Sequence, residues 1–381
     1  MFSRRTSFDR TPHPLARALA EARARGRPLL DLTESNPTRV ALPYDEEAIR
    51  RALAEGSVTQ YEPQPLGLPA ARRAVAAHIG AEPDRLLLTA STSEAYAHLF
   101  ALLCDPGDEV LVPQPSYPLL EHLTRLQSVQ PVPYPLEYDG EWHVDIDGLK
   151  RGRTVRTRAI VAVHPNNPTG SFVKRDELGA MADLGLPIVS DEVFAAYAFD
   201  DDPRRARSAL EATEALVFVL GGLSKLAGLP QMKLGWMTIG GPSARIREAT
   251  ERLEHIADSF LSVGTPVQNA AAGLLEQGAV TQRAIRARTR RNLRALQRTF
   301  DGDSAATVLR VEGGWYAVVR VPATLDETEW TLALLDAGVV VHPGWFYDFS
   351  APAYLVLSLL PLEATFDAGI DRLARVVRAH S

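Results

Sequence analysis

The chain has 381 residues and a mass of 41.6 kDa, a length that suits two domains or one large domain with a satellite. It carries 41 basic and 47 acidic residues, and this net charge of −6 without a long basic run argues against nucleic acid as the main partner. No apolar run is long enough for a membrane span, and no apolar segment follows the N-terminal arginines. The single cysteine, Cys104, excludes an internal disulfide and metal sites built on several thiolates. We therefore expect a cytoplasmic globular protein, most simply an enzyme, with no membrane partner.

Lysine is rare in this chain. Only four of the 41 basic residues are lysines, namely Lys150, Lys174, Lys225 and Lys233. The bias toward arginine most simply reflects the base composition of the genome and not function. Each remaining lysine is therefore a candidate for a function that arginine cannot perform. We expect Lys150 and Lys174 to be surface residues.

The first 44 residues are irregular and rich in proline, with one helix-like stretch at 15–25. From about residue 45, short apolar runs alternate with helical patterns, which is typical of a mostly parallel α/β sheet covered on both faces. The expected strands are 86–89, 109–113, 158–164, 187–190, 216–220 and 236–239. The expected helices between them are 70–78, 93–103, 119–126 and 175–183.

The pattern changes after residue 241. Helical patterns at 243–257, 267–276, 280–300 and 366–378 accompany strand-like runs at 308–311, 315–321, 338–342 and 354–359. We predict a three-layer α/β large domain at 45–270, a smaller α+β domain at 271–381, and an N-terminal arm at 1–44 that packs with the small domain.

Polar residues gather where four of the expected strands end, and ligands of open α/β sheets collect at such ends. They are the turn 89–95, the stretch 166–170, the sequence Ser190-Asp191-Glu192, and the pair Ser224-Lys225. Each also has an ordinary explanation, since Ser and Thr cap helices and Asn, Pro and Gly form turns. A lysine at a buried strand end is harder to explain without a function.

Together these residues suit one cofactor, a phosphorylated pyridine that carries an aldehyde. The aldehyde needs a lysine amine, the ring nitrogen needs a carboxylate, the ring oxygen needs a hydrogen-bond donor, and the phosphate needs a helix N-terminus. The sequence supplies Lys225, Asp191, Asn167 and the turn 91–93 for these four tasks.

The motifs resemble those of fold type I pyridoxal-phosphate enzymes of the class I/II aminotransferase family. The resemblance covers most of the chain, and its segments occur in the family's order. They are Tyr61 with Gly67-Leu68, the stretch 88–95, the strand entry 106–110, Pro113-Gln114-Pro115-Ser116-Tyr117-Pro118, Asn167-Pro168-Thr169-Gly170, Ser190-Asp191-Glu192, and Ser224-Lys225 with Gly228-Leu229.

The resemblance implies a role for each motif residue. Lys225 binds pyridoxal 5'-phosphate and moves the substrate proton, and Asp191 pairs with the ring nitrogen. Asn167 bonds the ring oxygen, and Tyr117 stacks on the ring. The phosphate is held by Ser91, Thr92, Ser93, Ser224 and Lys233.

The resemblance also implies a homodimer, in which Tyr61 reaches the phosphate of the neighbouring subunit. The implied reaction is amino-group transfer between an amino acid and a 2-oxo acid.

The chain departs from the family pattern at four positions. Gly222 stands where a serine often contacts the phosphate, Lys233 replaces an arginine, and Phe194 replaces a tyrosine that assists Asn167. Val356 stands where the family places the arginine that clamps the substrate carboxylate. Either the family pattern is aligned here in the wrong register, or the carboxylate is held by other residues, or the substrate lacks that group. Asn36 and Arg39 are the candidates for holding it, although a plain surface arginine is the simpler interpretation of Arg39.

Three hypotheses remain open from the sequence. The first is the aminotransferase, the second is a carbon–sulfur lyase or a decarboxylase on the same fold, and the third is a protein that binds the cofactor with little turnover. The substrate is not determined, because two aromatic clusters can form either pocket walls or core. These clusters comprise Trp315, Tyr316, Trp345, Phe346 and Tyr347.

Overall fold

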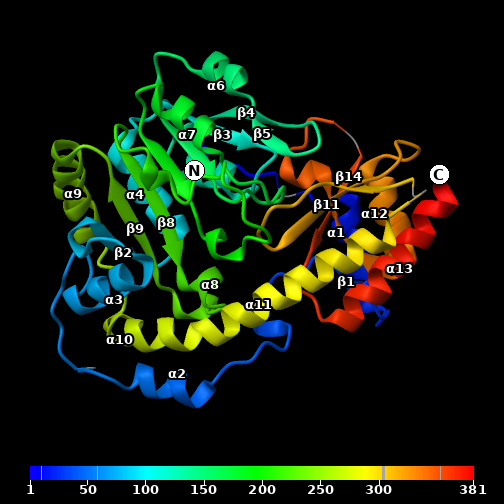
Figure 1. Ribbon diagram of the computed structural model, residues 1–381, viewed down its shortest axis with the longest axis horizontal. Helices are drawn as coiled ribbons and strands as arrows, with labels where there is room; N and C mark the ends of the chain where they lie inside the picture. Colours follow the sequence, from blue (N-terminus) through cyan, green and yellow to red (C-terminus); the bar gives the residue numbers. More distant parts are fainter. Residues whose placement is uncertain (10, 58, 303–304, 352) are drawn as a thin grey trace.

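The computed structural model describes residues 1–9, 11–57, 59–302, 305–351 and 353–381 (Figure 1). An eight-stranded sheet dominates the first two thirds of the chain, with the strand order β2-β9-β8-β7-β6-β3-β4-β5. The strands are β2 (Leu86–Thr89), β3 (Glu109–Gln114), β4 (Gln130–Tyr138), β5 (Trp142–Val144), β6 (Thr157–Val163), β7 (Ile188–Asp191), β8 (Val217–Gly222) and β9 (Gly235–Gly240).

The centre of this sheet is parallel. Strand β3 pairs in parallel with β4 and β6, and β6, β7 and β8 continue the parallel order. Strand β9 runs antiparallel to both β8 and β2, and β5 closes a hairpin with β4. The prediction of a mostly parallel α/β sheet is confirmed.

Helices cover both faces of the sheet and complete three layers. Helices α4, α5 and α9 pack on one face, where Leu99 and Leu253 meet Val110 and Phe218. On the other face, Leu149 of α6 and Leu178 and Met181 of α7 join another apolar cluster. The helices of this part are α2 (Glu46–Leu53), α3 (Pro69–Ile79), α4 (Thr92–Leu103), α5 (Leu119–Leu126), α6 (Ile146–Gly152), α7 (Arg175–Ala182), α8 (Leu223–Leu226), α9 (Ser243–Asp258) and α10 (Thr265–Asn269).

The C-terminal part forms a smaller α+β domain. Its antiparallel sheet has the order β10-β11-β14-β13, and a two-stranded parallel sheet joins β1 of the N-terminal arm to β12. The strands are β1 (Leu30–Asp31), β10 (Thr307–Val308), β11 (Tyr316–Arg320), β12 (Val339–Val340), β13 (His342–Pro343) and β14 (Tyr354–Ser358). The helices are α1 (Pro14–Ala24), α11 (Ala271–Thr299), α12 (Glu327–Asp336) and α13 (Glu363–His380).

The long helix α11 runs beneath both domains (Figure 1). Its first turns place Leu274 and Leu275 in an apolar cluster with β2 and β9, and its last turns place Leu293 and Leu296 in the core of the small domain. Helix α11 begins at Ala271 and contributes to both cores.

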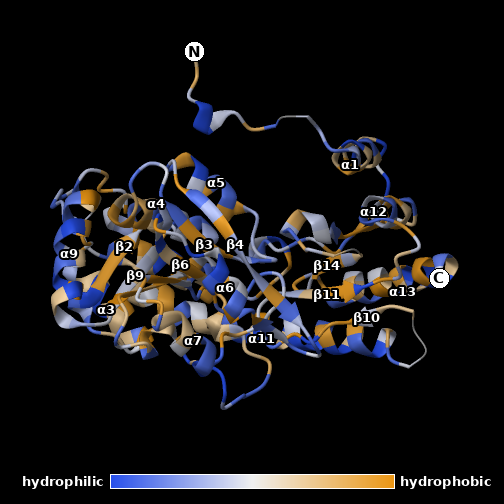
Figure 2. Cartoon of the chain, turned by 90° about the horizontal axis from the view of Figure 1, so that it is seen from above, coloured by the Kyte–Doolittle hydropathy of each residue, from blue (hydrophilic) through white to orange (hydrophobic). Residues whose placement is uncertain are grey.

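The N-terminal segment extends from α1 across the molecule to α5 (Figure 2). There the Arg125 guanidinium donates to the Ser7 carbonyl at 2.7 Å, and Phe8 contacts His122 with ring centroids 5.1 Å apart. The arm therefore touches the large domain as well as the small one. Among the described helices, none has the length and apolar character that crossing a membrane requires.

Candidate active site

A cavity of about 370 Å³ opens at the carboxyl edge of the large sheet. The ends of β6, β7 and β8 deliver their polar residues to it because parallel neighbouring strands end at one edge. Strand β2 runs in the same direction on the far side of antiparallel β9, and it adds the turn at 91–93. Nine of the site residues predicted from the sequence line this cavity: Ser91, Thr92, Ser93, Tyr117, Asn167, Asp191, Ser224, Lys225 and Lys233. Asn36 and Arg39 line an adjoining cavity, and Tyr61 lies elsewhere.

Lys225 lies in the short helix α8, directly after β8, with aromatic rings around its amine. The Nζ atom is 5.1 Å from the Trp315 ring centroid and 5.6 Å from the Phe194 ring centroid. Tyr197 Oη donates to the Lys225 carbonyl at 2.6 Å and fixes the backbone. Burial lowers the pKa of Lys225, against the opposing effect of the Asp191 carboxylate. A lowered pKa favours the neutral amine, which is the nucleophilic form.

Asp191 ends β7 and presents its carboxylate to the same cavity. Tyr96 Oη of α4 donates to Oδ2 at 3.4 Å, and the Val193 amide donates to Oδ1 at 3.2 Å. Burial nevertheless raises the pKa of Asp191 to about 6. A cation placed in the cavity would counter this desolvation and hold the carboxylate ionised. Tyr96 had no signal in the sequence beyond its place on a predicted helix.

Asn167 follows β6 and is 7% exposed. Its Oδ1 atom has no hydrogen-bond partner among the described residues. Because an amide oxygen can only accept, the group of this side chain that can donate to a ligand in the cavity is Nδ2. The preceding Asn166 differs, because its amide donates to Pro115 O at 3.1 Å and to Thr169 Oγ1 at 2.9 Å.

The start of α4 forms the anion-binding end of the cavity. Ser91 caps the helix by accepting from the Glu94 amide at 3.2 Å, and Glu94 Oε2 in turn accepts from the Ala90 amide at 2.6 Å. Thr92 and Ser93 form the first turn, where backbone N–H groups lack intrahelical partners and the helix dipole is positive. These groups suit a phosphate.

Two departures from the family pattern also lie at this cavity. Lys233 lines it in a left-handed backbone conformation, with φ 53° and ψ 47°. At Gly222, an added Cβ would come within 3.2 Å of both Gly235 Cα and the Leu234 carbonyl. A serine there would require the facing strand β9 to shift, so the glycine reflects close packing of β8 on β9.

Val356 lies in a fully apolar place. It is completely buried in β14, opposite Val318 of β11, and it packs in a cluster with Phe194, Trp315 and Tyr347. This position therefore contributes an aliphatic side chain to the core and no positive charge to the cavity.

The adjoining cavity, of about 480 Å³, shares Ser35, Lys225 and Pro230 with the first. Arg39 lines it with its side chain 73% exposed, and its Nη1 atom is 4.0 Å from Glu34 Oε2. Asn36 lines it too, but its Oδ1 atom already accepts from the Thr38 amide at 3.0 Å and the Thr38 hydroxyl at 2.7 Å.

Some of the remaining aromatic residues line the cavity, some are buried in the protein core, and others are exposed. Tyr316 lines the cavity, and burial raises its pKa to about 12 despite a hydrogen bond with Ser35. Trp315 and Tyr347 are buried in the core, whereas Trp345 and Phe346 are 38% and 42% exposed. Tyr61 is 76% exposed and lines a separate surface pocket that also includes His98.

Comparison with known proteins agrees with this geometry. The sequence profile of the family described as "Aminotransferase class I and II" matches residues 27–361. The alanine aminotransferase of Mycobacterium tuberculosis is 28% identical over 387 residues, covering 94% of this chain and 88% of that protein. The aspartate/prephenate aminotransferase of Thermus thermophilus is 29% identical over 381 residues, covering 95% of this chain and 94% of that protein.

Solved structures are similar over the whole chain. The alanine aminotransferase from Pyrococcus furiosus superimposes with a TM-score of 0.89 at 25% identity and covers 100% of both chains. The fold, the site and the profile define an aminotransferase of a family that uses pyridoxal phosphate. The chain belongs to the class I and II aminotransferases, enzymes that transfer an amino group between an amino acid and a 2-oxo acid.

Proposed function

We propose that this aminotransferase binds pyridoxal 5'-phosphate in the cavity at the carboxyl edge of the sheet. The observation that carries the proposal is the convergence of Lys225, Asp191 and Asn167 on one cavity with the N-terminus of α4 at its end. The raised pKa of Asp191 fits a cationic ring beside its carboxylate, and Asn167 lines the same cavity, where its Nδ2 group can donate to the ring oxygen. The cofactor, when bound, supplies an aldehyde and a protonated ring that withdraws electrons from the substrate α-carbon.

We assign each of these side chains a separate role. The Lys225 amine takes the proton from the substrate α-carbon and returns it, a task for which a neutral amine is required. Asp191 stays ionised and holds the protonated ring nitrogen, Asn167 bonds the ring oxygen, and Tyr117 covers the ring face. The phosphate is held by Ser91, Thr92, Ser93, Ser224 and Lys233.

Arg39 is the residue we propose for the substrate α-carboxylate. It lines the adjoining cavity that also reaches Lys225, and its nearest carboxylate is 4.0 Å away, so its guanidinium is only weakly engaged. Asn36 is the second candidate and would contribute through its amide nitrogen, because Thr38 already occupies Oδ1. Bidentate recognition of a carboxylate is what a guanidinium does best.

Replacing Arg39 with methionine should raise the KM for the amino acid by about 30- to 100-fold, with a smaller change in kcat, because a charge-assisted bond present in both ground and transition states is lost. Steady-state kinetics with a fixed 2-oxo acid measures this. Arg23→Met is the matched control, since Arg23 lines the same cavity but pairs with Asp31 at 3.2 Å. An Arg39→Met enzyme with unchanged KM would remove Arg39 from the substrate site.

We further propose a homodimer in which Tyr61 reaches the phosphate of the neighbouring subunit. Tyr61 is highly exposed and lies outside the cavity of its own chain, in a surface pocket that it shares with the exposed Leu261 and with His98, whose ring contacts the exposed Phe260. A surface with several large apolar side chains is suited to subunit contact. Association of two subunits would bury these side chains and complete the phosphate site.

A panel of single amino acids, mixed with the cofactor-loaded protein, tests the proposed function. Transamination converts the visible band of the bound cofactor to the spectrum of its aminated form and releases the matching 2-oxo acid. Release of pyruvate and ammonia without an acceptor would instead identify a carbon–sulfur lyase, and release of carbon dioxide a decarboxylase. A band that no amino acid alters would identify a cofactor-binding protein with little turnover.

A further inference from the structure

Lys174 is buried, and the prediction that it is a surface residue is wrong. Its Nζ atom lies 2.5 Å from Glu312 Oε1 and 2.6 Å from Glu312 Oε2, with the two side chains only 7% and 10% exposed. Lys174 precedes α7 of the large domain, whereas Glu312 lies between β10 and β11 of the small domain. A buried ion pair therefore joins the two domains.

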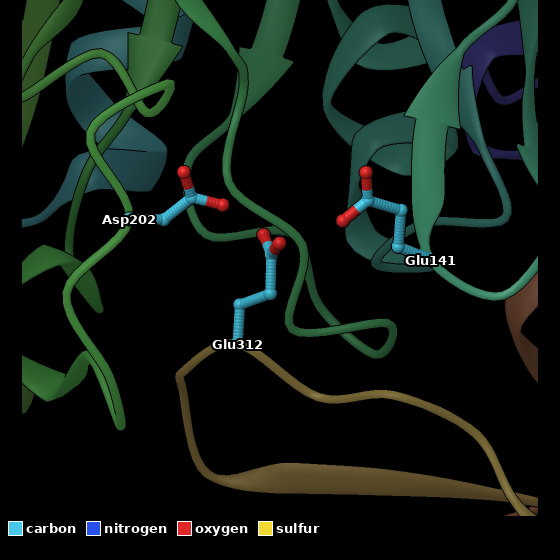
Figure 3. Close-up of side chains that lie close together, drawn as sticks. All are labelled: Glu141, Asp202 and Glu312. Atoms are coloured by element: carbon cyan, nitrogen blue, oxygen red, sulfur yellow. The ribbon is translucent and has the colours of Figure 1, made fainter.

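Glu312 belongs to a cluster of three carboxylates, and Figure 3 shows Glu141, Asp202 and Glu312 turned toward one another. Arg204 contacts Glu141 at 2.6 Å and Asp202 at 2.7 Å, and Arg310 contacts Glu141 at 3.0 Å. Three carboxylates are thus matched by three cations: Lys174, Arg204 and Arg310. The cluster is thus a balanced ion-pair network. Its two arginines are half exposed, whereas the Lys174–Glu312 pair is buried.

The backbones around this pair are in direct contact. The Gly313 amide donates to the Gly170 carbonyl at 3.0 Å, and the Phe172 amide donates to Glu312 Oε2 at 2.8 Å. Gly170 has φ +70°, and a Cβ at this residue would lie 2.5 Å from the Gly313 carbonyl oxygen. The Phe199 amide also donates to the Glu312 carbonyl at 2.9 Å. These contacts fix one alignment of residues 170–172 of the large domain against residues 312–313 of the small domain, and we call this contact the seam.

Both chain segments that form this seam continue to the active site. On the large-domain side, Asn167 precedes Gly170 by three residues and lines the cavity. On the small-domain side, Trp315 and Tyr316 follow Gly314 directly. Trp315 faces the Lys225 amine at 5.1 Å, and Tyr316 forms part of the cavity wall. The seam thus determines where the small domain places its rings relative to Lys225.

We propose that Lys174 and Glu312 are positioning residues whose ion pair holds Trp315 and Tyr316 against Lys225. The proposal rests on the proposed function in one respect, namely that Lys225 is the lysine that binds the cofactor. Neither member of the pair lines the cavity, so both act through the segment between Glu312 and Tyr316. Loss of the pair loosens this segment and admits water to the lysine.

The test compares cofactor-loaded wild type, Lys174→Met and the double variant Lys174→Met/Glu312→Gln. Lys174→Met leaves Glu312 buried and unpaired, so Tm should fall, and Gln at 312 should restore Tm by removing that charge. In both variants kcat should fall about tenfold with a smaller change in KM. The pH midpoint of the visible band should rise by about half a unit, because water favours the protonated form.

Arg204→Met is the matched control, because it removes an exposed cation of the same network and should leave kcat and the midpoint unchanged. A double variant with wild-type kcat and midpoint would overturn the proposal and reduce the pair to a structural role. A Lys225→Ala variant that keeps the visible band of the wild type would refute the proposed function instead, so the two failures are distinguishable.

Discussion

Replacing Lys225 with alanine should lower the rate of amino-group transfer by about 10⁴-fold or more, because the variant loses the amine that we propose both binds the cofactor and moves the proton. No other group can take over both tasks from the same position. The rings of Trp315 and Phe194 surround the amine, and burial lowers its pKa, which favours the neutral form. A water molecule in the vacated space would be a far weaker nucleophile.

The measurement is borohydride reduction of the loaded protein followed by peptide mass spectrometry. The cofactor mass should appear on the peptide containing Lys225 in the wild type and be absent in Lys225→Ala. Lys233→Ala is the matched control, since Lys233 is the other lysine lining this cavity and its variant should keep the label on Lys225. A label on Lys233 in the wild type would show that Lys233, and not Lys225, forms the covalent link to the cofactor.

Mixed dimers extend this prediction to the subunit arrangement. Lys225→Ala and Tyr61→Ala, each poorly active alone, should regain activity when mixed, because one site of the mixed dimer then has an intact Lys225 and a Tyr61 from its partner. Activity that stays at the level of the separate variants would place Tyr61 outside the neighbouring site.

The buried strands of the large sheet were predictable because their sequences are continuous apolar runs. Strands β2, β3 and β6 to β9 lie within one or two residues of the predicted ranges. Strand β4 was missed because Pro131, Pro133 and Pro135 alternate within it, and proline is a signal against a central strand. The Gln130 amide, one residue before Pro131, donates toward β3 at the Asp108 carbonyl (2.8 Å), and the Pro135 carbonyl faces the other side, where it accepts from the Asp145 amide at 3.0 Å. Since backbone groups alternate along a strand, the proline nitrogens point away from β3 and cost no hydrogen bonds to it.

The long helix shows where a local pattern misleads. Two helices at 267–276 and 280–300 were expected, whereas the structure has a short α10 and an unbroken α11. Gly278 lies inside α11, where glycine usually weakens a helix. A Cβ at Gly278 would lie 2.3 Å from the Ala227 Cβ, next to the helix that carries Lys225. The glycine thus serves close tertiary packing, which no local pattern reveals.

The polar site residues were predictable because their chemistry and order carry information, but their apolar surroundings were not. Lys225, Asp191 and Asn167 converge as the parallel topology requires. Tyr96 was not identified as a site residue, and Tyr316 was left open between pocket wall and core, because an aromatic residue on a helix or strand looks the same whether it packs in a core or faces a ligand. Only the tertiary structure brings Tyr96 to Asp191.

Asp191→Asn should lower turnover by about 10³-fold while making the cofactor-free protein more stable at pH 7. Asparagine keeps the shape and can still accept from the Val193 amide, but it cannot hold a protonated ring nitrogen by charge. Stability should rise because burial raises the pKa of Asp191 to about 6 from an ordinary value of 3.8. At pH 7 the folded protein therefore carries a desolvated charge that costs up to about 3 kcal/mol.

The sign of the pH dependence follows from the same shift. Between pH 3.8 and about 6 the folded protein retains a proton that the unfolded chain has released, so the stability of the wild type falls as pH rises through this window. The variant lacks this fall, and its advantage in Tm should vanish below about pH 4, where Asp191 is protonated in both states. Thermal unfolding of the cofactor-free proteins across this range measures the difference.

Glu192→Gln separates the role of Asp191 from the general effect of removing a buried carboxylate. Burial also raises the pKa of Glu192, to about 7, yet its Oε1 accepts from Ser190, Ser208 and the Ala209 amide and does not reach the cavity. Glu192→Gln should therefore retain turnover within about twofold of the wild type. If Asp191→Asn were as active as Glu192→Gln, the Asp191 carboxylate would not be the partner of the ring nitrogen. Neutralising Asp191 would then change only the stability of the protein.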